Sequence, residues 1–153
     1  MEKLLRKEIS SPRLSVSYEY IKHPTGLDIL LYPMEGFQSA YALFSTKYGS
    51  VDTTFKTDSD ADFVTVPEGI AHFLEHKMFE MDYGNVFDKF AKMGTSVNAF
   101  TNYTNTTYLF STTSNFKENL NLLLEFVETP YFTEDSVEKE KGIITQELRM
   151  YKD

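Results

Sequence analysis

Hydrophobic and polar residues alternate in the first third of the chain as they do in β-strands. The alternation covers residues 14–22, and an apolar run at 27–32 follows a Pro-Thr-Gly turn at 24–26. Glycine in such a turn can adopt the positive φ that a tight connection needs, so the pattern predicts a β-hairpin. A third strand is expected at 40–48, followed by a polar, Asp-rich segment at 50–64 that is expected to be mostly loop.

In the middle of the chain the apolar residues change to the spacing of a helix. Thr65 and Glu68 have the spacing of a capping box, which predicts a helix over about 66–80. Three further elements follow this helix in the prediction. They are a short helix ended by Gly94 and two strands around a polar turn, at 84–93, 96–101 and 106–113.

The last third of the chain is predicted to be helical. Asn115 and Glu118 again have capping-box spacing, and Pro130 marks the end of the helix that they open. Its apolar stripe is predicted to consist of Leu120, Leu123, Leu124 and Val127. Thr133 can cap a final helix. Strands followed by helices mixed with strands are typical of an α+β fold, with an antiparallel or mixed sheet packed against helices.

Composition limits the partners and the compartment that this protein can have. The 153 residues include 15 Lys and Arg against 23 Asp and Glu, for a net charge of −8. Nucleic acids and anionic membranes attract basic surfaces, so neither is expected as a partner. The chain has no cysteine, which excludes disulfides, thiolate nucleophiles and thiolate metal ligands. We find no apolar run typical of a signal peptide or a membrane span, and therefore expect a soluble, cytoplasmic protein.

The sequence His72-Phe-Leu-Glu75-His76 contains the residue types that metal binding and proton transfer require. Two of the three histidines in the chain are here, four residues apart, so on a helix they share one face. Neutral imidazoles are good zinc ligands, and a carboxylate at the edge of the same face can take a proton from a zinc-bound water. We therefore expect a metal site here, with one zinc ion per chain.

A catalytic zinc usually has three protein ligands, so a third must come from elsewhere. Without cysteine, the candidates are His, Asp or Glu. His23 is the only other histidine, and it lies in a predicted turn. Glu140 and Glu147 are better candidates, because they are two helical turns apart on one face of the last predicted helix, with apolar residues between them.

Taken together, these segments resemble the pitrilysin/insulinase family of zinc peptidases, whose signature joins His-x-x-Glu-His to a distant glutamate. Here Glu147 closes the run that begins at Glu138. Several flanking segments resemble the family as well. They are Gly49 to Asp52, Gly69 to Ala71, Met78-Phe79, Gly94, Asn98 to Thr101 and Thr107-Tyr108.

The resemblance implies a function and a set of roles. It implies a zinc-dependent metalloendopeptidase with His72, His76 and Glu147 as ligands and Glu75 as the general base. Glu140 matches a glutamate that supports the ligands from behind, without binding zinc itself. Asn98 and Ala99 match the strand edge along which an extended peptide substrate pairs.

Members of this family are much longer than 153 residues and have two similar halves. The resemblance therefore implies that residues 1–153 form one N-terminal catalytic, zinc-binding domain that is incomplete relative to the family. The missing second half, or another copy of the chain, is expected as a partner. Two alternatives remain open: a non-catalytic peptide-binding or assembly subunit of a peptidase pair, and a structural zinc domain. The intact set of four site residues favours the enzyme.

Overall fold

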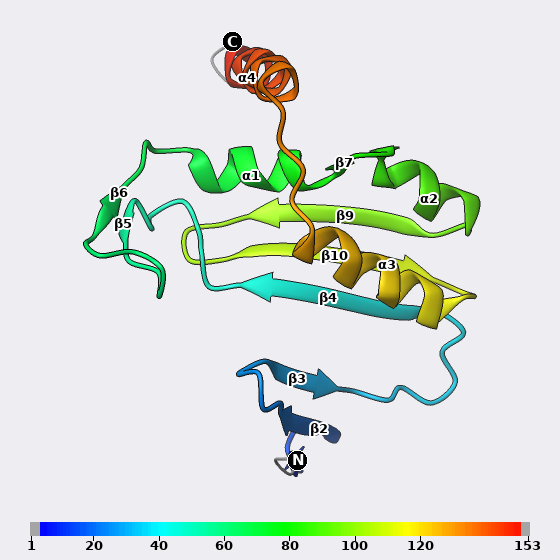
Figure 1. Ribbon diagram of the computed structural model, residues 1–153. Helices are drawn as coiled ribbons and strands as arrows, with labels where there is room; N and C mark the ends of the chain where they lie inside the picture. The colour runs from blue at the N-terminus through cyan, green and yellow to red at the C-terminus, as the bar shows by residue number, and fades with distance from the viewer. Residues whose placement is uncertain (1–3, 151–153) are drawn as a thin grey trace. The chain divides into compact units, whose positions relative to one another are not determined.

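A computed structural model of the chain describes residues 4–150 (Figure 1). The chain forms two compact units that divide between Phe37 and Gln38. The α+β class is confirmed, because antiparallel sheets and helices alternate along the chain. Within the described residues, none of the helices has the length and apolar character that crossing a membrane requires.

The first unit is a three-stranded antiparallel sheet of β1 (Leu5–Ser11), β2 (Val16–Lys22) and β3 (Asp28–Leu31), in that order. The predicted hairpin is confirmed as β2 and β3, and Gly26 in its turn has a φ of 92°. Strand β1 was not predicted, because its side chains are mostly exposed and its sequence lacks apolar alternation. It is held instead by a continuous ladder with β2.

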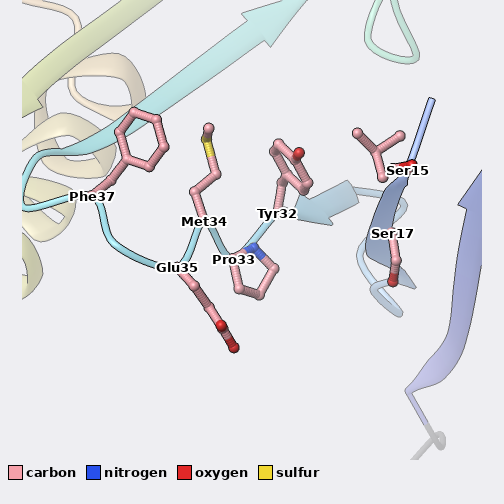
Figure 2. Close-up of a pocket in the computed structure, with 8 residues that line it drawn as sticks. Ser15, Ser17, Tyr32, Pro33, Met34, Glu35 and Phe37 are labelled. Atoms are coloured by element: carbon pink, nitrogen blue, oxygen red, sulfur yellow. The ribbon is translucent and has the colours of Figure 1, made fainter.

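A hollow of about 580 Å³ lies within this first unit, between the start of β2 and the segment that follows β3. Figure 2 shows Tyr32, Met34 and Phe37 pointing to one side of the backbone and Glu35 to the other. About half or more of the surface of each of these three residues is exposed. Among the described residues of the unit, Ile21 alone is buried, so the unit has a small core of its own.

The second unit is built on a sheet with the strand order β4–β10–β9, all antiparallel. The bounds are Ala40–Thr46 for β4, Ser96–Thr101 for β9 and Thr106–Thr112 for β10, as predicted to within two residues. Two short ladders lie outside this sheet. They are β5 (Thr54–Phe55) with β6 (Val64–Thr65), and β7 (Glu80–Met81) with β8 (Gly84–Asn85).

Four helices complete the unit: α1 (Ile70–Met78), α2 (Val86–Lys92), α3 (Phe116–Glu128) and α4 (Glu134–Met150). Helices α1 and α2 contact β9, and α3 contacts β10 and β4. Helix α4 contacts α1, so α1 lies between the sheet and the last helix (Figure 1). The sheet thus positions α1, and α1 provides the surface against which α4 packs.

The core lies on one face of the sheet. In register, Tyr108 is opposite Phe44 and Ala99, and Phe110 is opposite Ala42 and Val97. The helices close over this face with aromatic and aliphatic side chains. The buried cluster consists of Phe79, Met81, Val86, Phe90, Val97, Tyr108, Phe110, Leu122, Leu123 and Phe126.

The predicted start of α1 is wrong. Thr65 does not cap the helix, because it lies in β6, where its hydroxyl is 3.1 Å from that of Thr54. The helix begins at Ile70 and its N-cap is Gly69, which has a φ of 87° and makes no side-chain cap. Thr65 lies four residues before the actual N-cap, so its hydroxyl cannot cap the first turn of the helix.

The start of α3 was predicted correctly and its apolar stripe in part, since Leu123 is buried and Leu120 and Val127 pack against the core, but its cap was not. Asn115 adopts a left-handed conformation and its side chain caps nothing. The fully buried residues are Asn119, Leu122, Leu123 and Phe126, whereas Leu120, Leu124 and Val127 are partly buried at the flanks. The helix is therefore rotated relative to the predicted stripe, because the aromatic ring of Phe126 is placed against the core.

Candidate metal centre

Helix α1 places its two histidines side by side. His72 and His76 are one turn apart, and their ring centroids are 4.6 Å apart with the planes at 83°. Their side chains are 36% and 28% exposed, so both rings reach solvent. The two imidazoles are thus available to a common ion.

Helix α4 brings Glu147 to this pair. Its Oε2 atom is 3.7 Å from Nε2 of His72 and 3.7 Å from Nε2 of His76. One donor atom from each residue lies within 4.8 Å of the others. Donors at about 2.1 Å from a tetrahedral zinc lie about 3.4 Å from one another. The two nitrogens and the carboxylate oxygen are donor types that zinc prefers, and each nitrogen lies only slightly farther from the oxygen than in a tetrahedral site.

Glu140 contacts one of the histidines from behind. Its Oε1 atom is 2.9 Å from Nδ1 of His76, and its side chain is only 13% exposed. A carboxylate at this distance favours the proton on Nδ1, so Nε2 keeps its lone pair free on the side of Glu147. With the proton on Nδ1, this contact would hold the ring in the orientation that turns Nε2 toward Glu147.

Glu75 lies on α1 between the two histidines and is buried. The hydroxyl of Thr101, at the end of β9, donates a 2.7 Å hydrogen bond to its Oε2 atom. Burial, together with the charge of Glu75, raises the pKa of the Tyr108 phenol. The Glu75 carboxylate is therefore held against the sheet through its Oε2 atom.

The remaining predicted residues lie apart from this cluster or at its margin. Asn98 and Ala99 are in the middle of β9, an edge strand with no second strand partner among the described residues. His23 is in the first unit, where its Nδ1 atom is 2.7 Å from the hydroxyl of Thr25. It is not part of the donor cluster.

The sequence analysis did not predict that two further residues contact the candidate site residues. Thr101 was noted only as part of a resembling segment, and its bond to Glu75 depends on a strand-to-helix contact that no local pattern reveals. Lys77 was not noted at all, although it is completely buried beside His76. A lysine in a short helix gives no sign in the sequence that it is buried, since lysine side chains are usually exposed.

Comparison with known proteins assigns this chain to a family. The family model described as Insulinase (Peptidase family M16) matches residues 65–153, more than half of the chain. The chain belongs to the insulinase family. The matched segment contains both helices that carry the candidate donors, so the insulinase resemblance of the sequence is confirmed at the level of the family.

Relatives in the insulinase family agree with this assignment. The chain is 52% identical over 147 residues to the uncharacterized zinc protease YmfH of Bacillus subtilis (strain 168), covering 96% of this chain and 34% of that protein. It is 33% identical over 103 residues to the putative zinc protease AlbF of the same organism, covering 67% of this chain and 24% of AlbF.

Solved structures of this family share the fold. A putative M16-like peptidase from Alicyclobacillus acidocaldarius has a TM-score of 0.83 at 42% identity, over 93% of this chain and 32% of that one. Pitrilysin has a TM-score of 0.72 at 19% identity, over 95% of this chain and 16% of its own, which shows the fold alone. The chain thus spans about a third, or less, of the length of the proteins that it matches.

Proposed function

We propose that this chain is the zinc-binding part of a zinc-dependent metalloendopeptidase. The observation that carries the proposal is the convergence of two imidazoles and one carboxylate, from two different helices, at the spacing of a tetrahedral zinc. Membership of the insulinase family, and relatives that are named zinc proteases, support the same reading.

In this proposal His72, His76 and Glu147 hold one zinc ion per chain, and Glu140 orients His76. Zinc bound there would lower the pKa of a coordinated water to about 7 and polarise the scissile carbonyl. Glu75 accepts the proton of the attacking water and then delivers it to the amine that leaves, which balances the hydrolysis. Thr101 holds Glu75 by its other oxygen.

The proposed substrate is a peptide in extended conformation. Strand β9 forms one edge of its sheet, and its terminal residue Thr101 contacts Glu75. A peptide that paired along Asn98 and Ala99 would add a strand and pass beside the general base. The sequence of this chain covers about a third of its relatives, so we propose that cleavage also needs the rest of the fold, from a second half or another copy.

Metal content, measured by elemental analysis on protein never exposed to a chelator, tests the proposal. We expect close to one zinc per chain in the wild type and none in His76→Ala. A wild-type chain without zinc, at protein concentrations where the fold is intact, would contradict the proposed centre. The alternative of a non-catalytic subunit is distinguished by peptide cleavage measured on the protein that includes the rest of the fold, since this alternative predicts zinc without turnover there.

A further inference from the structure

Lys77 is a fully buried lysine one residue after a proposed zinc ligand. Its side chain has no exposed surface. The ammonium group donates to Oε2 of Glu80 at 2.6 Å and to the hydroxyl of Ser136 at 2.8 Å, and it lies 5.8 Å from the centre of the Phe132 ring. Burial of a charge is costly unless it is paired, so this arrangement needs its partners.

Ser136 connects this lysine to the start of α4. Its hydroxyl accepts from the Thr133 amide at 3.1 Å, and its own amide donates to the Thr133 hydroxyl at 3.2 Å. This reciprocal pair is a capping box with serine in the third helical position. The bond from Lys77 therefore reaches the capped first turn of α4.

The contact between Lys77 and Ser136 lies in one row with the other contacts of the site. Ser136, Glu140 and Glu147 are four and seven residues apart, so they lie along one face of α4. Their partners on α1 occur in the reverse order: Lys77 for Ser136, His76 for Glu140, and both histidines for Glu147. The two helices therefore run antiparallel, and Lys77 is at one end of a single row of contacts.

Helix α4 has few other means of holding its place. Ser136 is its only fully buried residue within the part that the structure describes, and Ile143 and Leu148 are exposed. Glu147 is three turns beyond Ser136, about 16 Å along the axis at 1.5 Å per residue. A small rotation or slide at Ser136 would thus carry the Glu147 carboxylate away from the histidines.

From these contacts we infer that Lys77 is a positioning residue of the metal centre. It fixes the start of α4 against α1, so that Glu140 meets His76 and Glu147 meets both imidazoles. The inference rests on the proposed zinc site, and it assigns to Lys77 no contact with the metal or the substrate.

Lys77→Met tests the inference. Methionine has a similar length and no charge, Glu80 is one-third exposed and can be solvated, and the bonds between Thr133 and Ser136 remain. We expect the variant to fold and to bind zinc about 10- to 100-fold more weakly, the range found when a residue that orients a ligand is removed. Competition with a chromophoric chelator measures the zinc Kd. Lys89→Met is the matched control, since Lys89 contacts Glu125 and Tyr83 and should leave the Kd unchanged.

A double variant separates positioning from a general loss of structure. If Lys77 acts through Glu147, adding Glu147→Ala to Lys77→Met should weaken zinc binding much less than Glu147→Ala does in the wild type. An unchanged Kd in Lys77→Met, or losses that simply multiply, would overturn the inference. If Lys77→Met does not fold, Ser136→Ala removes the same bond from the side of α4, and Thr133→Val, which disturbs the cap but keeps the Lys77 bond, is its control; equal zinc Kd values in these two variants would overturn the inference.

Hydrogen exchange in metal-free protein gives a readout that does not depend on zinc. Amides of α4 should exchange faster in Lys77→Met than in the wild type, while those of α3 should not change. Equal protection of α4 in both proteins would overturn the inference even where zinc binds. If the wild type binds no zinc but its α4 amides still exchange more slowly than those of Lys77→Met, the contact between the helices is supported and the proposed function is contradicted.

Discussion

At the scale of single residues, the side chains of the centre differ in what surrounds them. His72, His76 and Glu147 are about one-third exposed, whereas Glu140 and Glu75 are largely withdrawn from solvent. The exposed donors can be reached by an ion and a substrate, and the withdrawn carboxylates are held by His76 and Thr101. The facing sides of α1 and α4 together therefore provide both access and support.

Glu75→Gln should abolish peptide cleavage and leave zinc in place. Glutamine keeps the shape and can still contact Thr101, but it cannot accept the proton of water. We expect at least about a 100-fold loss of kcat, the lower range for removal of a general base. The assay is cleavage of a reporter peptide by the form of the protein that is active, with zinc content measured on the same sample. Normal cleavage would show that the base is another residue.

Glu147→Ala should remove zinc from the protein. Loss of a residue behind a ligand already costs about 10- to 100-fold in affinity, so loss of a ligand should exceed about 100-fold. The zinc Kd is measured by chelator competition. Glu138→Ala is the control on the same helix, because Glu138 is exposed and pairs with Lys141. Equal affinities in the two variants would exclude Glu147 from the set of ligands.

Tyr108 should make the folded state sensitive to alkaline pH. Burial and the charge of Glu75 raise the pKa of its phenol above the ordinary 10.0, so the unfolded chain loses this proton at a lower pH than the folded one. The stabilising contribution is complete below pH 10 and is lost as the pH rises toward the folded value. Urea unfolding from about pH 9 to about pH 11 should show a shallower loss of stability in Tyr108→Phe than in the wild type. Parallel curves would contradict this expectation.

At the scale of elements, the sequence predicted those whose pattern depends on a buried face. Strands β4, β9 and β10 and the ends of α3 agree with the alternation and the proline signals. Strand β1 could not be predicted, because an exposed strand needs a partner rather than an apolar face. The start of α1 was misplaced because Thr65 pairs with Thr54 in the β5–β6 ladder and the chain enters the helix only at Gly69.

The site shows the same division between what is local and what is not. The spacing of His72 and His76 on one helix follows from the sequence alone. The contacts of Glu140 with His76, of Thr101 with Glu75 and of Lys77 with Ser136 join distant segments. For Glu140 and Glu147, the resemblance to a family supplied roles that spacing alone left open.

Gly69→Ala should destabilise the second unit. Gly69 caps α1 at a φ of 87°, where an L side chain is strained, although an added Cβ would meet no neighbour. The expected cost is about 1 kcal/mol of unfolding free energy. Gly142→Ala is the matched control in α4, where space is also open and the helix should gain about 0.5 to 1 kcal/mol. Urea unfolding measures both, and equal effects of the two substitutions would contradict the role of the backbone at Gly69.

At the scale of the whole molecule, the donors all belong to the unit that begins at Gln38, and that unit holds most of the buried core. The sheet fixes α1, and α4 depends on a short row of contacts with α1. A zinc ion shared by the two helices would therefore stabilise α4, in whose described part Ser136 alone is buried. Stability and metal binding should be linked in this protein.

Zinc should raise the melting temperature, and chelation should lower it. Free zinc at about 100 times its Kd adds about 2.7 kcal/mol to the free energy of unfolding, provided that the unfolded chain binds none. Calorimetry of the chain with zinc and with chelator measures the shift. His76→Ala should show the same melting temperature under both conditions. A zinc-dependent shift that persists in His76→Ala would place the ion elsewhere.

The antiparallel row of contacts between α1 and α4 also has a consequence for biosynthesis. His76 and Glu140 are 64 residues apart, and Lys77 and Ser136 are 59 apart, so α1 emerges from the ribosome long before α4 exists. Until then the nascent chain offers only a pair of imidazoles, which is a weak binding site for any divalent ion. The amino end of α4 appears first and can dock through Ser136, and the carboxylate of Glu147 arrives last. A zinc ion held by all three proposed donors would therefore bind only after synthesis has passed Glu147.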